Sequence, residues 1–134
     1  MMWLLDTNVW IGYLNPAPSP VKHQISAHRI DEMVLCDVVK AELYYGAFKS
    51  SRRDANLALV DGLCQSFPGL AFDGRAARHF GEIRAQLARQ GQLIGPYDML
   101  IAAMALANGC VLVTHNTAEF SRIPDLPLED WELT

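Results

Sequence analysis

Residues 1–8 read MMWLLDTN, so five apolar residues run directly into Asp6. A short apolar run bounded by polar residues is typical of a buried strand, and we expect one at residues 3–5. The same break follows residues 111–113, where a second apolar run meets the polar segment 114–116. In a parallel sheet the carboxyl ends of the strands meet at one edge, where functional crevices lie. The two polar segments are therefore expected side by side.

Strands and helices alternate through the rest of the chain. Further strands are expected at residues 34–36 and 70–72, with a small edge strand at 126–128. Helical spacing and capping residues place helices at residues 8–14, 21–30, 38–49, 53–64, 74–89 and 96–107, with Asp37 and Asp73 as N-caps. Short connections between these elements predict an α/β fold, with a central parallel sheet of about four to five strands flanked by helices.

Single acidic residues stand where these elements meet. Glu42 lies in the helix after the second strand, and Asp98 opens the apolar helix before the fourth. Glu119 follows Asn116 by three residues. A carboxylate flanked by apolar residues is costly to desolvate without a partner, and carboxylates brought together repel by roughly 4 kcal/mol per pair at 4 Å and an effective dielectric near 20. We therefore expect a cation among them, and the chain is interpreted as a metal-dependent enzyme.

Oxygen ligands alone suit Mg²⁺ or Mn²⁺, which take carboxylates and waters in octahedral geometry. A metal held by Asp6 and Asp98 would polarise a phosphodiester and lower the pKa of an attacking water. A second metal about 3.5–4 Å away would stabilise the leaving oxygen. For each acid alone, a helix cap or a solvated surface charge is the competing interpretation. The joint pattern is the stronger argument.

The composition is that of a compact globular protein. The 134 residues are 51% apolar and 19% charged, which predicts one domain spanning residues 1–134. The first apolar run has five residues, and no later stretch reaches about 18 without a charge, so neither a signal peptide nor a membrane span is expected. A cytoplasmic location is then the default.

The net charge of −4 includes the candidate site itself and does not exclude a nucleic-acid partner. Three cysteines without a CxxC pair are expected to be buried hydrophobes.

Nearly the whole chain resembles the PIN-domain nucleases, and more closely the VapC toxins of bacterial type II toxin–antitoxin pairs. The resemblance is carried, in family order, by LLDTN (4–8), VVKAELYYGA (38–47), IRAQLARQG (83–91), IGPYD (94–98), VTHNTAEF (113–120) and LEDW (128–131). It implies a PIN-like three-layer fold and a metal-dependent RNA endonuclease that uses Mg²⁺ or Mn²⁺.

The resemblance also implies roles for particular residues. Asp6 and Asp98 would be the main metal ligands, with Glu42 as a third acid. Asn116 would orient a ligand or a water, and the hydroxyls of Thr7 and Thr114 would support the site. The fourth acid of the family is often an aspartate. Here that position is Glu119, one methylene longer, so we expect its contact to run through water or a second metal.

The partners implied by the resemblance are an antitoxin and RNA. A cognate VapB-type antitoxin would inhibit the enzyme by lying across the acidic crevice, with an arginine placed among the carboxylates. A homodimer within a higher toxin–antitoxin assembly is expected, with no membrane partner. The substrate would be a structured RNA, and a tRNA cut in its anticodon loop is favoured over ribosomal RNA.

Two sets of cations are candidates for phosphate contacts: Lys49, Arg52 and Arg53 after the Glu42 helix, and Arg84 and Arg89 before Asp98. Solvated helix faces are the alternative interpretation for both sets. Tyr44 and Tyr45 are expected either to stack on an unpaired base or, more often, to pack at a subunit contact.

Other functions are less well supported by the residues. A phosphatase with an aspartyl nucleophile at Asp6 needs an acid at the position of Asn8, and the chain has no Walker motif. The four histidines show neither ligand nor triad spacing. The remaining alternative is a catalytically inactive PIN-like binding module that acts with its antitoxin at an operator, although the acidic positions are all filled.

Overall fold

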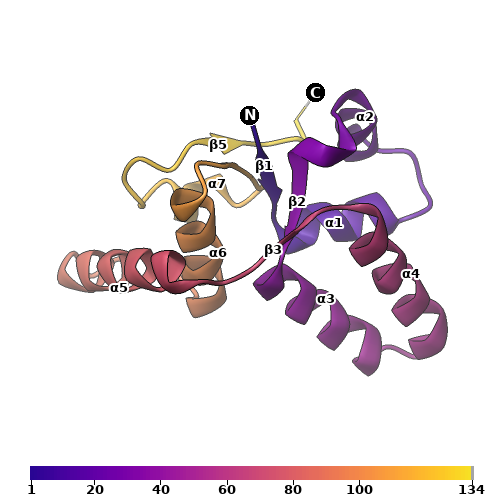
Figure 1. Ribbon diagram of the computed structural model, residues 1–134, viewed down its shortest axis with the longest axis horizontal. Coiled ribbons are helices and arrows are strands. Elements are labelled where there is room, and N and C mark those ends of the chain that lie inside the picture. Colours follow the sequence, from indigo (N-terminus) through magenta and orange to yellow (C-terminus); the bar gives the residue numbers. More distant parts are fainter. Residues whose placement is uncertain (134) are drawn as a thin grey trace.

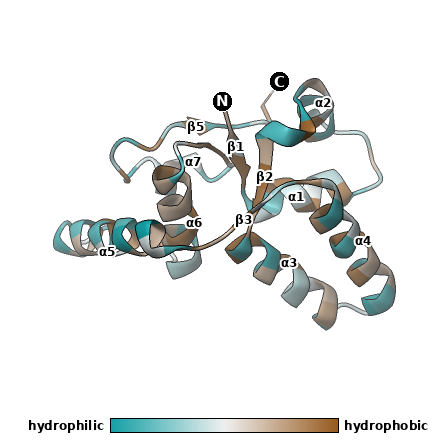
Figure 2. Cartoon of the chain, in the orientation of Figure 1, coloured by the Kyte–Doolittle hydropathy of each residue, from teal (hydrophilic) through white to brown (hydrophobic). Residues whose placement is uncertain are grey.

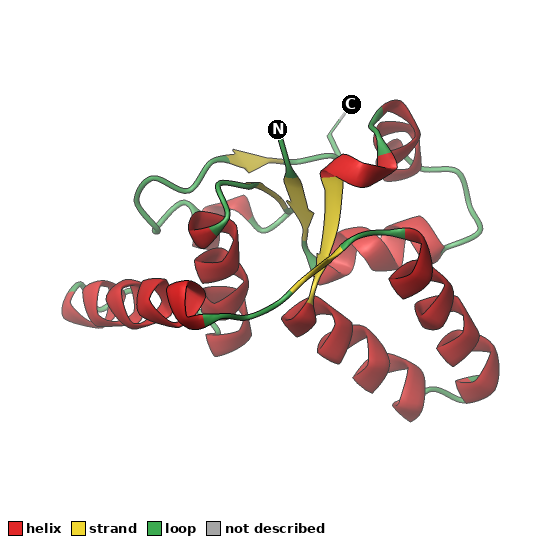
Figure 3. Ribbon diagram, in the orientation of Figure 1, coloured by secondary structure: helices red, strands yellow, loops and turns green. Residues whose placement is uncertain are grey.

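The structure, a computed structural model, describes residues 1–133 and contains a five-stranded sheet in which all neighbouring strands are parallel. The strands lie in the order β3-β2-β1-β4-β5 (Figures 1 and 3). Their bounds are β1 Trp3–Leu5, β2 Met33–Cys36, β3 Gly69–Leu70, β4 Val111–Val113 and β5 Leu128–Glu129. The predicted α/β fold with a parallel sheet is confirmed, and the strand predicted at residues 3–5 is its centre.

Helices make up most of the remaining chain. Their bounds are α1 Thr7–Leu14, α2 Pro20–Ala27, α3 Asp37–Lys49, α4 Arg53–Ser66, α5 Gly74–Arg89, α6 Pro96–Ala107 and α7 Thr117–Phe120, with a 3₁₀ turn η1 at Ile30–Glu32. The pairs α3–α4 and α5–α6 stand on either side of the strands in Figure 1. None of the helices in the described part of the chain has the length and hydropathy that a membrane crossing needs.

The core consists of the sheet and the helix faces packed on it. The strands β1, β2 and β4 are apolar on both faces, as strands covered by helices on both sides must be (Figure 2). Helix α6 is buried nearly all round, as its uninterrupted apolar sequence predicts, with Met99 and residues 101–105 inaccessible or nearly so. This burial fixes the helix that carries Asp98.

Several predicted boundaries were wrong by a few residues. Helix α2 ends at Ala27 rather than at residue 30, because the chain turns into the 3₁₀ segment before β2. The expected N-cap Asp37 lies inside the first turn of α3, with Cys36 at the cap position. By contrast, Asp73 does cap α5, since its carboxylate accepts a hydrogen bond of 3.0 Å from the backbone of Ala76.

The short strands at the sheet edges lie differently from the prediction. Strand β3 covers Gly69–Leu70 rather than residues 70–72, and β5 covers Leu128–Glu129 rather than 126–128. The carbonyl of Pro127 accepts a 2.9 Å hydrogen bond from the backbone N–H of Leu112. Because proline has no N–H to donate, the paired residues of β5 begin only at Leu128. Helix α7, a single turn that carries Glu119, was not predicted. Its four residues are too short to show a helical period.

Candidate functional site

Asp6 lies at the carboxyl end of β1 and is held there by two hydrogen bonds. Its Oδ1 accepts from the backbone N–H of Thr7 at 2.8 Å, which makes Asp6 the N-cap of α1. Its Oδ2 accepts from the hydroxyl of Thr114 at 2.9 Å. Only 8% of Asp6 is exposed, and this burial raises the pKa of its carboxyl, while the two hydrogen bonds act in the opposite direction.

Glu42 joins the same site from α3. The hydroxyl of Thr7 donates a 2.7 Å hydrogen bond to Glu42 Oε1. Thr7 therefore contacts both acids, one through its backbone and one through its side chain. The competing interpretation of Glu42 as a solvated helix charge does not hold, because its carboxylate is half-buried and is fixed across the gap between α1 and α3.

Asp98 is the third residue of α6 and is half-buried. Burial is the largest cause that raises the pKa of Asp98 from 3.8 to about 6, followed by the negative charges of Asp6, Glu42 and Glu119. These three carboxylates lie near enough to Asp98 to disfavour its charged form. No lysine or arginine within residues 1–133 forms a salt bridge with any of the four. The structure thus places Asp6, Glu42 and Glu119 within electrostatic range of Asp98, with no lysine or arginine of the described chain paired with any of the four.

The loop after β4 closes the site. The backbone N–H of Asn116 donates to the hydroxyl of Thr114 at 3.0 Å, so Thr114 links this loop to Asp6. The side chain of Asn116 is exposed and forms no hydrogen bond with any described residue. Glu119 follows on α7 and is half-buried. The amide of Asn116 is therefore available for a ligand or a water.

The donors at this site suit a hard divalent cation. Apart from the hydroxyls of Thr7 and Thr114 and the amide of Asn116, the groups that could bind a metal ion here are carboxylate oxygens, which Mg²⁺ and Mn²⁺ prefer. Burial and then the neighbouring charges raise the pKa of Asp98, and a bound cation would relieve the repulsion between these charges. The residues present therefore fit such an ion.

A groove of about 830 Å³ adjoins the acidic site between α1, α3 and α6. Thr7 and Glu42 belong to both the site and the groove. The other lining residues are mostly apolar or aromatic: Ile11, Val38, Ala41, Tyr45, Gly46, Tyr97 and Leu100, with Asp37 and Lys49. The sequence prediction missed this groove, although Tyr45 stands three residues after Glu42 and hence on the same side of α3.

The two neighbouring tyrosines, Tyr44 and Tyr45, have different surroundings. Tyr44 packs against the core and donates a 2.6 Å hydrogen bond to Asp61 on α4, so part of its ring is already covered within the chain. Tyr45 is 67% exposed, and the ammonium of Lys49 lies 4.9 Å from its ring centroid. Arg52 and Arg53 follow at the exposed turn into α4, whereas Arg84 and Arg89 are exposed on α5.

The structure also shows the surroundings of the cysteines and of His115. All three cysteines are free thiols, and the prediction that they are buried is confirmed for Cys36 and Cys110, whereas Cys64 is only half-buried. The histidines have no ligand spacing in the sequence, but the fold places His115 beside Asp130 and Glu132. The spacing of these three residues in the sequence does not indicate the cluster. Residues 130–132 lie next to the loop after β4 only because β5 pairs with β4.

The match to known families agrees with this arrangement. A model described as the PIN domain matches residues 3–126. The chain therefore belongs to the PIN-domain family.

Curated relatives narrow the assignment. The chain is 40% identical over 131 residues to a protein of Shigella flexneri named tRNA(fMet)-specific endonuclease VapC, covering 98% of both chains. It is 33% identical over 133 residues to ribonuclease VapC2 of Rickettsia felis, covering 98% of this chain and 99% of that one. Within the PIN-domain family the chain is a member of the VapC group.

Solved structures have the same fold. The DNA-bound VapBC structure from Salmonella typhimurium contains a chain with a TM-score of 0.91 and 40% identity, with 98% of each chain covered. The VapBC2 structure from Rickettsia felis, bound to a promoter fragment, gives a TM-score of 0.89 at 32% identity, covering 98% of this chain and 99% of that one.

Proposed function

We propose that this protein is a metal-dependent endoribonuclease and the toxin of a type II toxin–antitoxin pair. The observation that carries the enzymatic part is the set of carboxylates Asp6, Glu42, Asp98 and Glu119. Burial and then the charges of the other three raise the pKa of Asp98, and none of the four has a salt-bridge partner within the described chain. Such a cluster is stable as a set of anions only with a bound cation. Relatives of this length and similarity are named as endonucleases and ribonucleases.

In this proposal each residue has a defined task. Asp6 and Asp98 are the main metal ligands, and Glu42 is the third. Thr7 and Thr114 hold two of these carboxylates in place by hydrogen bonds of 2.7–2.9 Å, which limits their reorientation. The amide of Asn116 orients a ligand or a water, and Glu119 acts through water or a second ion. The bound divalent cation, Mg²⁺ or Mn²⁺, would polarise the phosphodiester and lower the pKa of the attacking water.

The substrate we propose is a structured RNA, and specifically a tRNA cut in its anticodon loop. The Shigella relative that is 40% identical is named for a tRNA, which supports this choice. Tyr45 offers an exposed ring beside the acidic site for an unpaired base, and Lys49 lies next to it. Lys49 and Arg52 form no salt bridge among the described residues, which leaves both charges available for phosphates. An enzyme with this substrate would work in the cytoplasm.

The partner we propose is a VapB-type antitoxin, because related chains were solved in complexes of the toxin–antitoxin kind, some of them on DNA. A dimer of this chain within a larger assembly is part of the same proposal. The apolar groove along α1, α3 and α6 opens onto the acidic site. A segment bound there, with an arginine among the carboxylates, would take the place of the metal ion and block the site.

The experiment that tests the nuclease is incubation of antitoxin-free protein with total tRNA, in Mg²⁺ or in EDTA. Discrete fragments in Mg²⁺ alone would support the proposal, and mapping of their ends would identify the tRNA. If tRNA stays intact, ribosomal RNA is tested next under the same conditions. Intact RNA in both would favour the alternative, an inactive module that acts with its antitoxin at an operator.

The toxin role has its own test in growing cells. Expression of the wild-type protein without antitoxin should arrest growth, and expression of Asp6→Asn should not, because a carboxylate in contact with Thr7 and Thr114 is lost while its shape is kept. Unaffected growth with the wild-type protein would count against the toxin role.

A further inference from the structure

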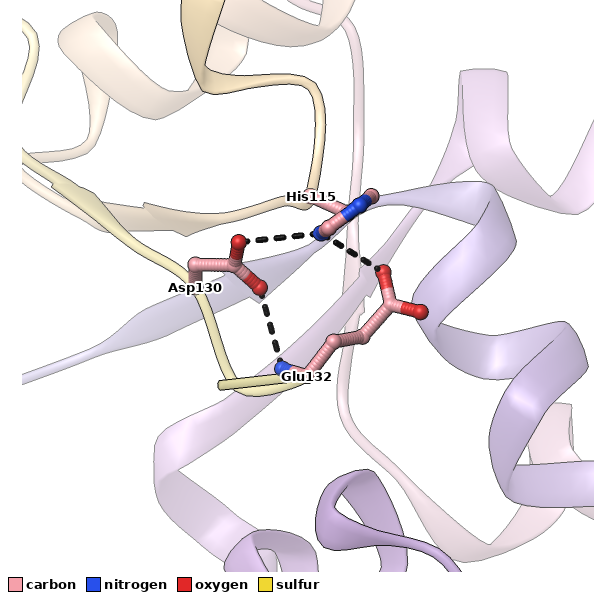
Figure 4. Close-up of side chains that lie close together, drawn as sticks. All are labelled: His115, Asp130 and Glu132. Atoms are coloured by element: carbon pink, nitrogen blue, oxygen red, sulfur yellow. Dashed lines mark hydrogen bonds and ion pairs between the residues drawn. The ribbon is translucent and has the colours of Figure 1, made fainter. Parts of the chain in front are cut away.

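A second group of metal-binding side chains lies outside the acidic site. The ring Nδ1 of His115 is 3.0 Å from Asp130 Oδ2 and 3.3 Å from Glu132 Oε2 (Figure 4). One ligand atom from each of the three side chains lies within 4.8 Å of the other two. His115 comes from the loop after β4, whereas Asp130 and Glu132 come from the segment after β5. The cluster therefore joins two parts of the chain that are adjacent only in the fold.

Among the described residues, His115 is the only basic side chain that pairs with the two carboxylates of this cluster. Neither Asp130 nor Glu132 contacts a lysine or arginine within the described residues. A neutral imidazole offers only one proton at Nδ1, which cannot donate well to two carboxylates at once. The two distances from Nδ1 already match the spacing of neighbouring ligands around an ion with bonds of about 2.0–2.2 Å, namely about 3.0–3.5 Å. A cation in place of that proton would contact all three groups.

The segment that carries both carboxylates is fixed in position. Trp131, between them, is only 3% exposed and stacks on His28 with ring centroids 4.4 Å apart. Its indole N–H donates to Glu129, which also accepts from the indole of Trp3. The carboxylate of Asp130 is oriented by a 3.0 Å hydrogen bond from the backbone N–H of Glu132 (Figure 4). Little reorganisation is therefore needed for binding.

We propose that His115, Asp130 and Glu132 bind a divalent transition-metal ion of the Zn²⁺ class. An imidazole with two carboxylates suits Zn²⁺ or Co²⁺ better than Mg²⁺, which prefers oxygen ligands alone. The site differs in chemistry from the acidic cluster, but the two share a loop: His115 follows Thr114, whose hydroxyl holds Asp6. An ion bound here joins the segment after β5 to the loop that carries Asn116.

The test uses Co²⁺ as a spectroscopic substitute for Zn²⁺, titrated into antitoxin-free protein in excess Mg²⁺ so that the acidic cluster is occupied. Visible absorption and calorimetry are measured for the wild type, His115→Ala, Glu132→Gln and Asp98→Asn. The matched control is His23→Ala, because His23 is exposed on α2 and is not one of the residues that make up the cluster. His115 is itself 63% exposed in its side chain, so its removal should leave the fold intact.

The wild type and His23→Ala should bind one Co²⁺ with the absorption of a nitrogen-ligated ion. His115→Ala should weaken this binding by at least about 10-fold, and Glu132→Gln should weaken it measurably. Equal Co²⁺ affinity in His115→Ala and the wild type would mean an adventitious ion only and would overturn the proposal. Loss of Co²⁺ in Asp98→Asn but not in His115→Ala would overturn it too, since the ion would then lie in the acidic cluster. None of these readouts depends on RNA cleavage.

Discussion

At the residue scale, Asp98 is where the competing forces are most evident. Its position in the first turn of α6 favours a negative charge there, because the helix N-terminus is positive. Burial and three neighbouring carboxylates outweigh this and raise its pKa to about 6. In the absence of a cation, a proton is therefore bound more tightly by the folded protein than by the unfolded chain.

This difference predicts how the metal-free protein responds to pH. The unfolded pKa is 3.8 and the folded pKa is about 6, so the contribution of protonated Asp98 to stability is fully present below 3.8 and is lost as pH rises through about 6. The expected loss is about 1–2 kcal/mol after discounting for solvent screening, measured by urea unfolding in EDTA between about pH 4.5 and about pH 7.5.

Asp98→Asn should reduce this pH dependence and stabilise the metal-free protein near neutral pH. The matched control is Asp54→Asn, because the side chain of Asp54 is 97% exposed. An unchanged pH dependence in Asp98→Asn would show that Asp98 is not the group responsible.

Thr114 is the second residue with a specific expected effect. It is completely buried, donates to Asp6 and accepts from the backbone of Asn116. Thr114→Val keeps the shape but leaves both partners unpaired, so we expect a loss of about 1–3 kcal/mol in the free energy of unfolding and a weaker nuclease. Thr114→Ser keeps the hydroxyl and should behave nearly as the wild type. Equal losses in the two variants would indicate a packing effect instead.

Single residues were predictable from the sequence to different degrees. Asp6 and Asp98 stand at strand and helix ends, so their convergence at one sheet edge follows from parallel topology. The hydrogen bond from Thr7 to Glu42 was not predictable, because it depends on the distance between α1 and α3. The roles assigned to these residues as ligands stay predictions.

At the element scale, the short helix α7 decides how Glu119 reaches the site. Its single turn ends at Phe120, which is fully buried and anchors the turn to the core. Of the three carboxylates whose charges raise the pKa of Asp98, Glu119 has the smallest effect. Its influence is thus weaker than that of Asp6 or Glu42.

Glu119→Ala should accordingly weaken cleavage without abolishing it, by about 10-fold in the rate at saturating Mg²⁺. Glu119→Asp should retain more activity than Glu119→Ala, because it keeps the charge. The rate is measured by gel on a substrate that the wild type cleaves. Complete loss in Glu119→Ala would mean that Glu119 binds the metal directly.

Elements with a clear period were predictable, and the shortest ones were not. The helices α5 and α6 have long apolar patterns and lie where the sequence placed them. Helix α7 and strand β5 have four and two residues, and their positions depend on contacts with Phe120 in the core and with strand β4. Local sequence carries no signal of those contacts.

At the scale of the whole molecule, the acidic cluster lies beside an apolar groove that Lys49 also lines, and Lys49 forms no salt bridge within residues 1–133. The net charge of −4 does not reveal this arrangement, which depends on where the charges lie. The prediction of the sheet and of the family was correct, since both depend on the order of the elements and motifs. The groove arises from three helices distant in sequence and was invisible until the fold was known.

The most direct test of the central claim is the rate of RNA cleavage in Mg²⁺ by the wild type, Asp98→Asn and Asp54→Asn. All three are compared on the same total tRNA. If the carboxylate cluster holds the catalytic ion, Asp98→Asn should be slower by at least about 100-fold, while Asp54→Asn should match the wild type. Cleavage by Asp98→Asn at the wild-type rate would contradict the account, because the cluster would then not be the active site.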